Sequence, residues 1–175
     1  MSTWSAAKEN WTTGDLVLAT DLNLIGNDIN WLKAPPSANV LLNHTNDLFT
    51  TSTSFVDVNN TLLTLSITTT GGNLLIGFSG TISNSTLAAA TYLDVNIFDG
   101  SSNVRFAGDD GLTAIQQSVA SHMYNASFVV LKTGLPADTY TLTLQWKVTS
   151  GTALLYSGAG TSQHDIHGHF WVREV

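Results

Sequence analysis

The sequence predicts a mainly β protein in which a short helix precedes an antiparallel two-sheet sandwich or a closed barrel. Two observations predict this fold class. Residues 39–175 alternate apolar and polar side chains with a period of two, and Gly, Asn and Asp interrupt the alternation at turns. Residues 1–38 carry a helical period instead. No crossover-helix pattern lies between the strands, so the sequence does not favour a parallel, doubly wound sheet.

The helix is expected from Asp21 to Lys33, with Thr20 as its N-cap and the Pro pair at 35–36 as its stop. Its apolar residues are spaced 3, 4 and 3 apart, the a and d positions of a heptad: Leu22, Ile25, Ile29 and Leu32. One interpretation is an amphipathic helix packed on its own domain. The other is a short helical bundle on a symmetry axis. Two heptads do not hold a coiled coil together in water, so the bundle would need the rest of the chain to assemble.

The strands begin after a stiff linker over residues 34–38. The clearest strand is Thr139–Val148, whose expected buried face is Tyr140, Leu142, Leu144, Trp146 and Val148. The other expected strands are Val40–Leu42, Ser54–Val58, Leu63–Ile67, Leu74–Ile82, Leu93–Ile97, Val104–Ala107, Ala126–Val130, Ala153–Tyr156 and His167–Val175.

The composition excludes several function classes. Charged residues are 11% of the chain and the net charge is −7, which argues against a nucleic-acid surface. No apolar run approaches 18 residues, and residues 1–10 do not resemble a signal peptide, so no membrane insertion is expected. The chain has no cysteine, which excludes thiolate chemistry. No nucleophile elbow appears and Glu9 and Glu174 are the sole glutamates, so an enzyme is not expected.

Two stretches carry a resemblance to known families. Trp11-Thr-Thr-Gly-Asp-Leu-Val-Leu-Ala-Thr-Asp-Leu-Asn23 resembles the opening of bacteriophage tail-fibre and virion appendage proteins, where such a segment attaches to the particle. Gly134-Leu-Pro-Ala-Asp-Thr-Tyr-Thr-Leu-Thr-Leu144 resembles a turn and core strand of jelly-roll domains of the tumour-necrosis-factor-like type. Asp138 stands where that family usually has glycine.

The resemblance implies a phage virion structural protein, with residues 1–38 as the attachment segment and residues 39–175 as a jelly roll. Such domains are commonly homotrimers, so Leu22, Ile25, Ile29 and Leu32 are the expected trimer interface. The implied partners are other virion proteins and a host-surface glycan or protein, and the implied role is adhesion or decoration. The alternative is a monomeric carbohydrate-binding β-sandwich, for which Tyr92 and Trp171 are the candidate ligand surface.

The histidine-rich stretch 164–169 has three interpretations. Its histidines line a polar surface and bind nothing. Alternatively, His167 and His169 from three subunits hold a structural transition metal on a threefold axis, a device that the resemblance to phage fibres favours. The third is a cupin-like metal site that adds Glu174, although the chain lacks that family's second motif. No other cofactor is expected.

The Asp109-Asp110 pair lies between two glycines and offers carboxylate oxygens of the kind that calcium prefers, with Asp99 and Asn103 as further ligands. Asp and Gly are also ordinary turn residues, so a solvated turn is the competing interpretation.

Overall fold

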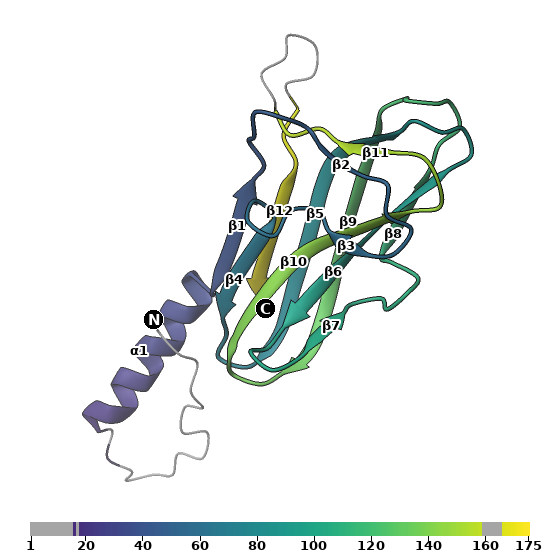
Figure 1. Cartoon of the computed structure of the whole chain (residues 1–175). Coiled ribbons are helices and arrows are strands. Elements are labelled where there is room, and N and C mark those ends of the chain that lie inside the picture. Colours follow the sequence, from purple (N-terminus) through teal and green to yellow (C-terminus); the bar gives the residue numbers. More distant parts are fainter. Residues whose placement is uncertain (1–15, 17, 159–165) are drawn as a thin grey trace.

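The computed structural model describes residues 16, 18–158 and 166–175. The first fifteen residues of the predicted attachment segment and residue 17, and with them residues 11–15 and 17 of the tail-fibre resemblance, lie outside the described residues, as do His164 and Asp165. Figure 1 shows the architecture, a two-sheet sandwich with one helix beyond its lower end. Within the described ranges, no helix is long and apolar enough to cross a membrane.

Helix α1 spans Ala19–Lys33 and begins two residues before the predicted start. The Asp21 carboxylate accepts a hydrogen bond from the Leu18 amide at 3.0 Å, which satisfies one free amide of the first turn. Thr20 lies inside the helix, so its prediction as the N-cap was wrong. The helix ends before the two prolines, as predicted, because proline cannot continue the hydrogen-bond ladder.

Sheet A contains β1 (Ser37–Leu41), β2 (Leu48–Thr50), β5 (Gly72–Asn84), β9 (Tyr124–Leu135), β11 (Ala153–Leu155) and β12 (His169–Glu174). The thirteen-residue β5 is its central strand. Strand β9 pairs with one edge of β5, and β12 and β11 pair in succession with the other edge. Strand β1 then pairs with β12, and β2 with β11, all antiparallel.

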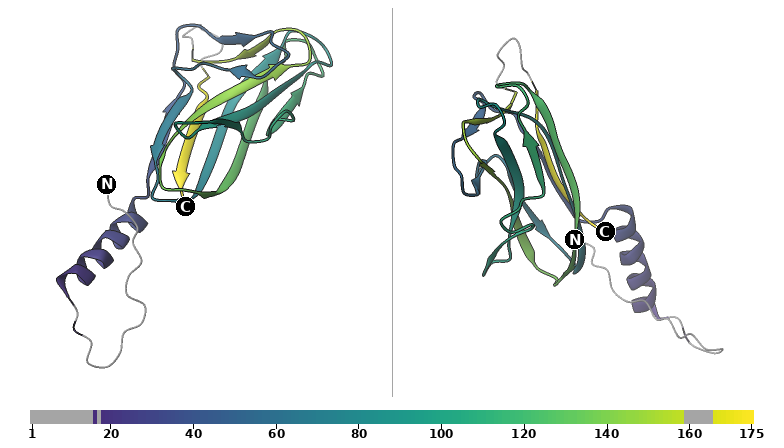
Figure 2. Two further views of the ribbon diagram at one scale, coloured as in Figure 1. Left: turned by 60° about the horizontal axis from the view of Figure 1, so that its bottom comes forward. Right: turned by 90° about the vertical axis from the view of Figure 1, so that its right-hand side faces the viewer.

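Sheet B contains β3 (Val56–Asp57), β4 (Thr64–Thr68), β6 (Ala90–Phe98), β7 (Asn103–Arg105), β8 (Thr113–Gln116) and β10 (Thr139–Val148). Its centre is the antiparallel pair of β6 and β10. The outer edge of β10 carries β4 and β3, and the outer edge of β6 carries β7 and β8. Figure 2 shows the two sheets stacked as layers.

The chain crosses between the sheets repeatedly. Strands β4, β6 and β10 belong to sheet B, whereas β5, β9 and β12, which follow them in the sequence, belong to sheet A. The long strands therefore lie in the spatial orders β1-β12-β5-β9 and β4-β10-β6-β8. This is the jelly-roll arrangement of two Greek keys, and it confirms the predicted fold class of a mainly β sandwich with a short helix.

The core lies between the sheets and consists of the inward side chains that the alternation predicts. Tyr140, Leu142, Leu144, Trp146 and Val148 of β10 are all buried. In the predicted strand His167–Val175, Phe170 and Val172 share the side that alternation favours for burial, and both are buried opposite the β10 side chains. The fully buried carboxylate of Glu174 accepts hydrogen bonds from the backbone amide and hydroxyl of Thr70, at 2.9 and 2.8 Å, which offset the cost of its burial.

The turn before β10 forms without a left-handed residue at Asp138. The left-handed residue is Gly134, with φ of 69°. The Tyr140 hydroxyl donates a hydrogen bond to the Pro136 carbonyl at 3.0 Å and holds the turn against the start of the strand. This segment therefore retains the core strand that the jelly-roll resemblance implies, and the missing glycine is tolerated.

Candidate functional site

The predicted trimer-interface residues lie on an uncovered helix face. The exposed fractions of Leu22, Ile25, Ile29 and Leu32 are 60, 39, 45 and 62%. Helix α1 covers neither sheet and extends past the end of the sandwich (Figures 1 and 2). The interpretation of a helix packed on its own domain is therefore wrong for this stripe. Its role as a trimer interface stays a prediction.

A second apolar surface lies on the outer side of sheet A, where the strand registers bring together Leu41, Leu75, Val129, Leu131 and Trp171; we call it the outer A face. Three of its residues are conspicuously exposed: Leu41 at 58%, Val129 at 61% and Leu131 at 47%. Uncharged Asn39, Ser79 and Ser127 continue the same side of the sheet, and the exposed cation Arg173 lies on it beside Leu75. The apolar and uncharged part of this face loses little hydration energy when another surface covers it.

Trp171 lies flat on the outer A face because Gly77 leaves room for its ring. A Cβ atom at Gly77 would stand 2.3 Å from two carbons of the indole, far inside van der Waals contact. Tyr92, the other predicted ligand-surface aromatic, lies on β6 in sheet B. The two rings therefore belong to opposite faces of the sandwich and do not form one platform.

The two predicted metal ligands are held in different surroundings. The His167 ring hydrogen-bonds through Nδ1 to the Leu42 carbonyl at 2.8 Å, and His169 opens β12 on the outer side of sheet A. Glu174 faces inward and accepts a hydrogen bond from Thr70. The three residues of the cupin-like site, His167, His169 and Glu174, are therefore not brought together. Within the described residues no group of three or more metal-ligating side chains occurs. A metal shared between subunits stays a prediction.

The outer side of sheet B holds a hollow of about 630 Å³, which we call the sheet B hollow. Its polar and aromatic lining comes from Phe55, Asp57, Asn96, Asn103, Arg105 and Gln145. The registers explain this gathering, because Gln145 pairs with Asp57 of β3, and Asn96 pairs with Arg105 of β7. Sequence reasoning singled out Asn103 among these residues, as a possible calcium ligand, and missed the others.

The lining is organised by hydrogen bonds between side chains. The Gln145 amide donates from Nε2 to Asp57 Oδ1 at 2.8 Å, and Asn96 donates from Nδ2 to Asn103 Oδ1 at 2.7 Å. Arg105 forms an ion pair with Asp109 at 3.0 Å. The charged groups of Arg105 and Lys147 lie 5.1 and 4.7 Å from the centre of the Phe55 ring. These contacts fix the side chains before any ligand arrives.

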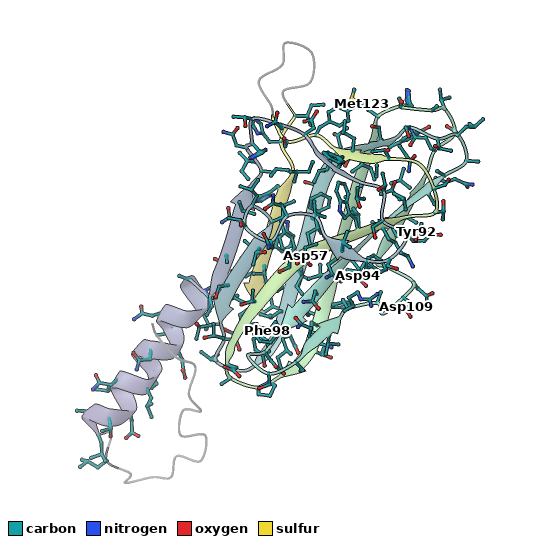
Figure 3. The ribbon with its side chains drawn as sticks, in the orientation of Figure 1. Asp57, Tyr92, Asp94, Phe98, Asp109 and Met123 are labelled. Atoms are coloured by element: carbon teal, nitrogen blue, oxygen red, sulfur yellow. The ribbon has the colours of Figure 1, made fainter. Side chains whose placement is uncertain are left out.

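Asp94 anchors the loop that borders the hollow. It lies on β6 with no solvent exposure, and Figure 3 shows it between Asp57 and Asp109. Its carboxylate accepts hydrogen bonds from the amides of Val95, at 2.7 Å, and Ala107, at 3.2 Å. Burial raises the pKa of Asp94 above its ordinary value, and these hydrogen bonds oppose the rise.

The predicted calcium ligands serve separate turns. Asp109 pairs with Arg105, and Asn103 accepts from Asn96. The Asp99 carboxylate caps its own turn by accepting from the amides of Ser101 and Ser102, which lowers the pKa of Asp99. The structure thus gives Asp109, Asn103 and Asp99 structural partners, in accord with the interpretation of solvated turns.

The raised pKa of Asp94 predicts a pH effect on stability. The folded state binds the Asp94 proton more tightly than the unfolded state does. The contribution of Asp94 to the free energy of unfolding therefore falls as pH rises from 3.8, the ordinary pKa, through the raised pKa of the folded state. Asp94→Asn should therefore gain stability relative to the native chain across that window, as measured by urea unfolding at a series of pH values. Asp99→Asn is the matched control and should lose stability relative to the native chain as pH rises towards 3.8, because the pKa of Asp99 is lowered. Parallel pH profiles for all three proteins would contradict the assignment.

Comparisons with known proteins give likenesses of structure. No protein-family model matches the sequence. No curated protein matches it either. A solved structure of the Eiger TNF protein from S. frugiperda has 12% identity and a TM-score of 0.48, over 80% of this chain and 94% of that one.

Two further similar structures are the globular domain of zebrafish complement 1qA protein and murine APRIL. The first has 12% identity and a TM-score of 0.45, over 81% of this chain and 97% of that one. The second has 8% identity and a TM-score of 0.43, over 79% and 99%. At these values the likenesses say nothing about partners, ligands or assembly, so the jelly-roll assignment rests on the strand order of the chain itself.

Proposed function

We propose that the protein is a homotrimeric structural protein of a bacteriophage particle. In this proposal residues 1–38 attach the trimer to other virion proteins, and the jelly roll projects for adhesion to a host surface or for decoration of the particle. The phage particle is proposed from the resemblance of residues 11–23 to tail-fibre openings. The trimeric state is proposed from the resemblance of residues 134–144 to jelly-roll domains that are commonly trimers.

The observation that carries the proposal is the uncovered apolar stripe of α1. A 15-residue helix has little stability of its own in water. Its stripe has heptad spacing and is not packed against the sandwich, so copies of the same helix are the partners that its spacing fits. The outer A face supports the same assembly, because apolar and uncharged side chains there are uncovered in the single chain.

The assembly is tested by the solution mass of the full chain. We expect sedimentation equilibrium at micromolar concentration to give three times the chain mass of 18.7 kDa. An antibody against the jelly roll should label phage particles in electron micrographs, and mass spectrometry should find the chain in those particles. A mass of one chain would overturn the trimer, and particles without the chain would overturn the virion role.

A second candidate function is a monomeric carbohydrate-binding module. The sheet B hollow favours it, because the hollow is built within a single chain and needs no assembly. A solution mass of one chain, together with saccharide binding, would support this alternative.

A further inference from the structure

We infer that the sheet B hollow is a binding site for a neutral saccharide. The inference deepens the adhesion part of the proposed function, and it names the face of the domain that recognises the host. It does not need the trimer, since every residue of the hollow comes from one chain.

The size of the hollow and its place on the molecule fit a small ligand. Its volume of about 630 Å³ lies within the range of ordinary ligand sites, which is roughly 300–1,000 Å³. It lies on the outer side of sheet B, on the face of the sandwich opposite to the outer A face. A trimer that covers the outer A face would therefore leave the hollow open to solvent.

The lining matches hydroxyl groups, which both donate and accept hydrogen bonds. The amides of Asn96, Asn103 and Gln145 offer donors and acceptors within one small region, and Asp57 adds a carboxylate. The two amide contacts described above each use one donor and one acceptor. Among the described residues, Asn96 Oδ1 and Asn103 Nδ2 have no partner, and so remain for a ligand.

One acceptor in this region is buried without a partner. Gln145 Oε1 is inaccessible to solvent and receives no hydrogen bond within the described part of the chain. Asp57 fixes the amide in this orientation, because a flipped amide would turn Oε1 towards its carboxylate. Because Oε1 is closed to solvent, it is also closed to a ligand hydroxyl, and Gln145 acts on the hollow through the hydrogen bond that holds Asp57 in place.

The charges indicate a neutral ligand. Arg105 of the lining is already paired with the Asp109 carboxylate, and Lys147 is not among the residues that line the hollow. Asp57 is bonded by a neutral amide, so its negative charge remains uncompensated and would repel an acidic sugar. Because both cations already lie against the Phe55 ring, we expect hydrogen bonds rather than ring stacking to supply most of the affinity.

The test uses the full chain on a glycan array that contains neutral and acidic oligosaccharides, with its solution mass measured on the same sample. We expect binding to a group of neutral glycans. Gln145→Met, which keeps the length of the side chain but removes the amide, should weaken that binding at least tenfold, and so should Asn103→Ala. Gln116→Met is the matched control, because Gln116 is exposed on β8 outside the hollow, and it should bind as the native chain does.

Three outcomes would overturn the inference. They are no glycan bound, binding confined to acidic glycans, or neutral binding that Gln145→Met and Asn103→Ala leave unchanged. The solution mass separates this failure from failure of the assembly. A trimer that binds no neutral glycan would contradict the saccharide site but support the assembly. A monomer that binds neutral glycans would support the site but contradict the assembly.

Discussion

Phe170→Ala should lower the free energy of unfolding by about 3–5 kcal/mol. Phe170 has no solvent exposure, and it lies beside Phe78 of β5, which in turn lies beside Phe128 of β9. The three rings form a row across the inner side of sheet A, and truncation of the first would leave a cavity that the sheet cannot close. A loss of this size is a large fraction of the roughly 5–15 kcal/mol that holds a typical domain together.

Phe49→Ala is the matched control for this experiment. Phe49 lies on β2 at the edge of sheet A and is 71% exposed, so its truncation should change stability by no more than about 0.5 kcal/mol. Urea unfolding, followed by tryptophan fluorescence, should be measured at one protein concentration, because assembly makes apparent stability depend on concentration. Equal losses for the two variants would contradict the inward position of Phe170.

The faces of the long strands were predictable from the sequence because they are a local property. Alternation along β10 gave both its bounds, Thr139–Val148, and its buried side. The same reasoning placed Phe170 and Val172 of β12 in the core. A period of two survives wherever one side of a strand meets a core and the other meets solvent, so no knowledge of the partner strand is needed.

The sheet B hollow was not predictable because strand pairing creates it. Asp57 and Gln145 are separated by 88 positions, and only the register of β3 on β10 brings them together. Strands were predicted at both contributing positions, Ser54–Val58 and Val104–Ala107, but β3 and β7 have only two and three residues, and alternation does not say which strand they pair with. The available signal was Gln145 itself, since the predicted strand already placed its polar side chain on the solvent face.

The predicted ligand-surface pair of Tyr92 and Trp171 shows the same limit of prediction from one strand at a time. Alternation assigns a side chain to one side of its own strand, but it does not say to which sheet the strand belongs. Tyr92 and Trp171 were both correctly excluded from the inner side, yet β6 and β12 lie in different sheets. Strands β2 and β8, which have three and four residues and pair at the edges of the sheets, were not predicted.

Ile29→Asp should dissociate the proposed trimer. Ile29 is 45% exposed in the single chain, so the substitution should leave the jelly roll folded, as far-ultraviolet circular dichroism would show. In a helical bundle the same position would bring one carboxylate from each subunit onto a common axis, where burial and mutual repulsion oppose assembly. The loss of buried isoleucine alone typically costs about 2–5 kcal/mol, and each 1.4 kcal/mol is a tenfold change in affinity. Sedimentation should therefore give the mass of one chain.

Two further variants show which surface is responsible. Asn27→Asp adds the same charge to α1 away from the stripe, at an exposed position, and should leave the mass unchanged. Leu131→Asp places a carboxylate on the outer A face, where Leu131 is 47% exposed. If both surfaces meet in one assembly, Ile29→Asp and Leu131→Asp should each reduce the mass. A trimer that survives Ile29→Asp but dissociates with Leu131→Asp would assign assembly to the sheet alone. The helix stripe would then be left free to bind the particle, because it would still be uncovered in the assembled protein.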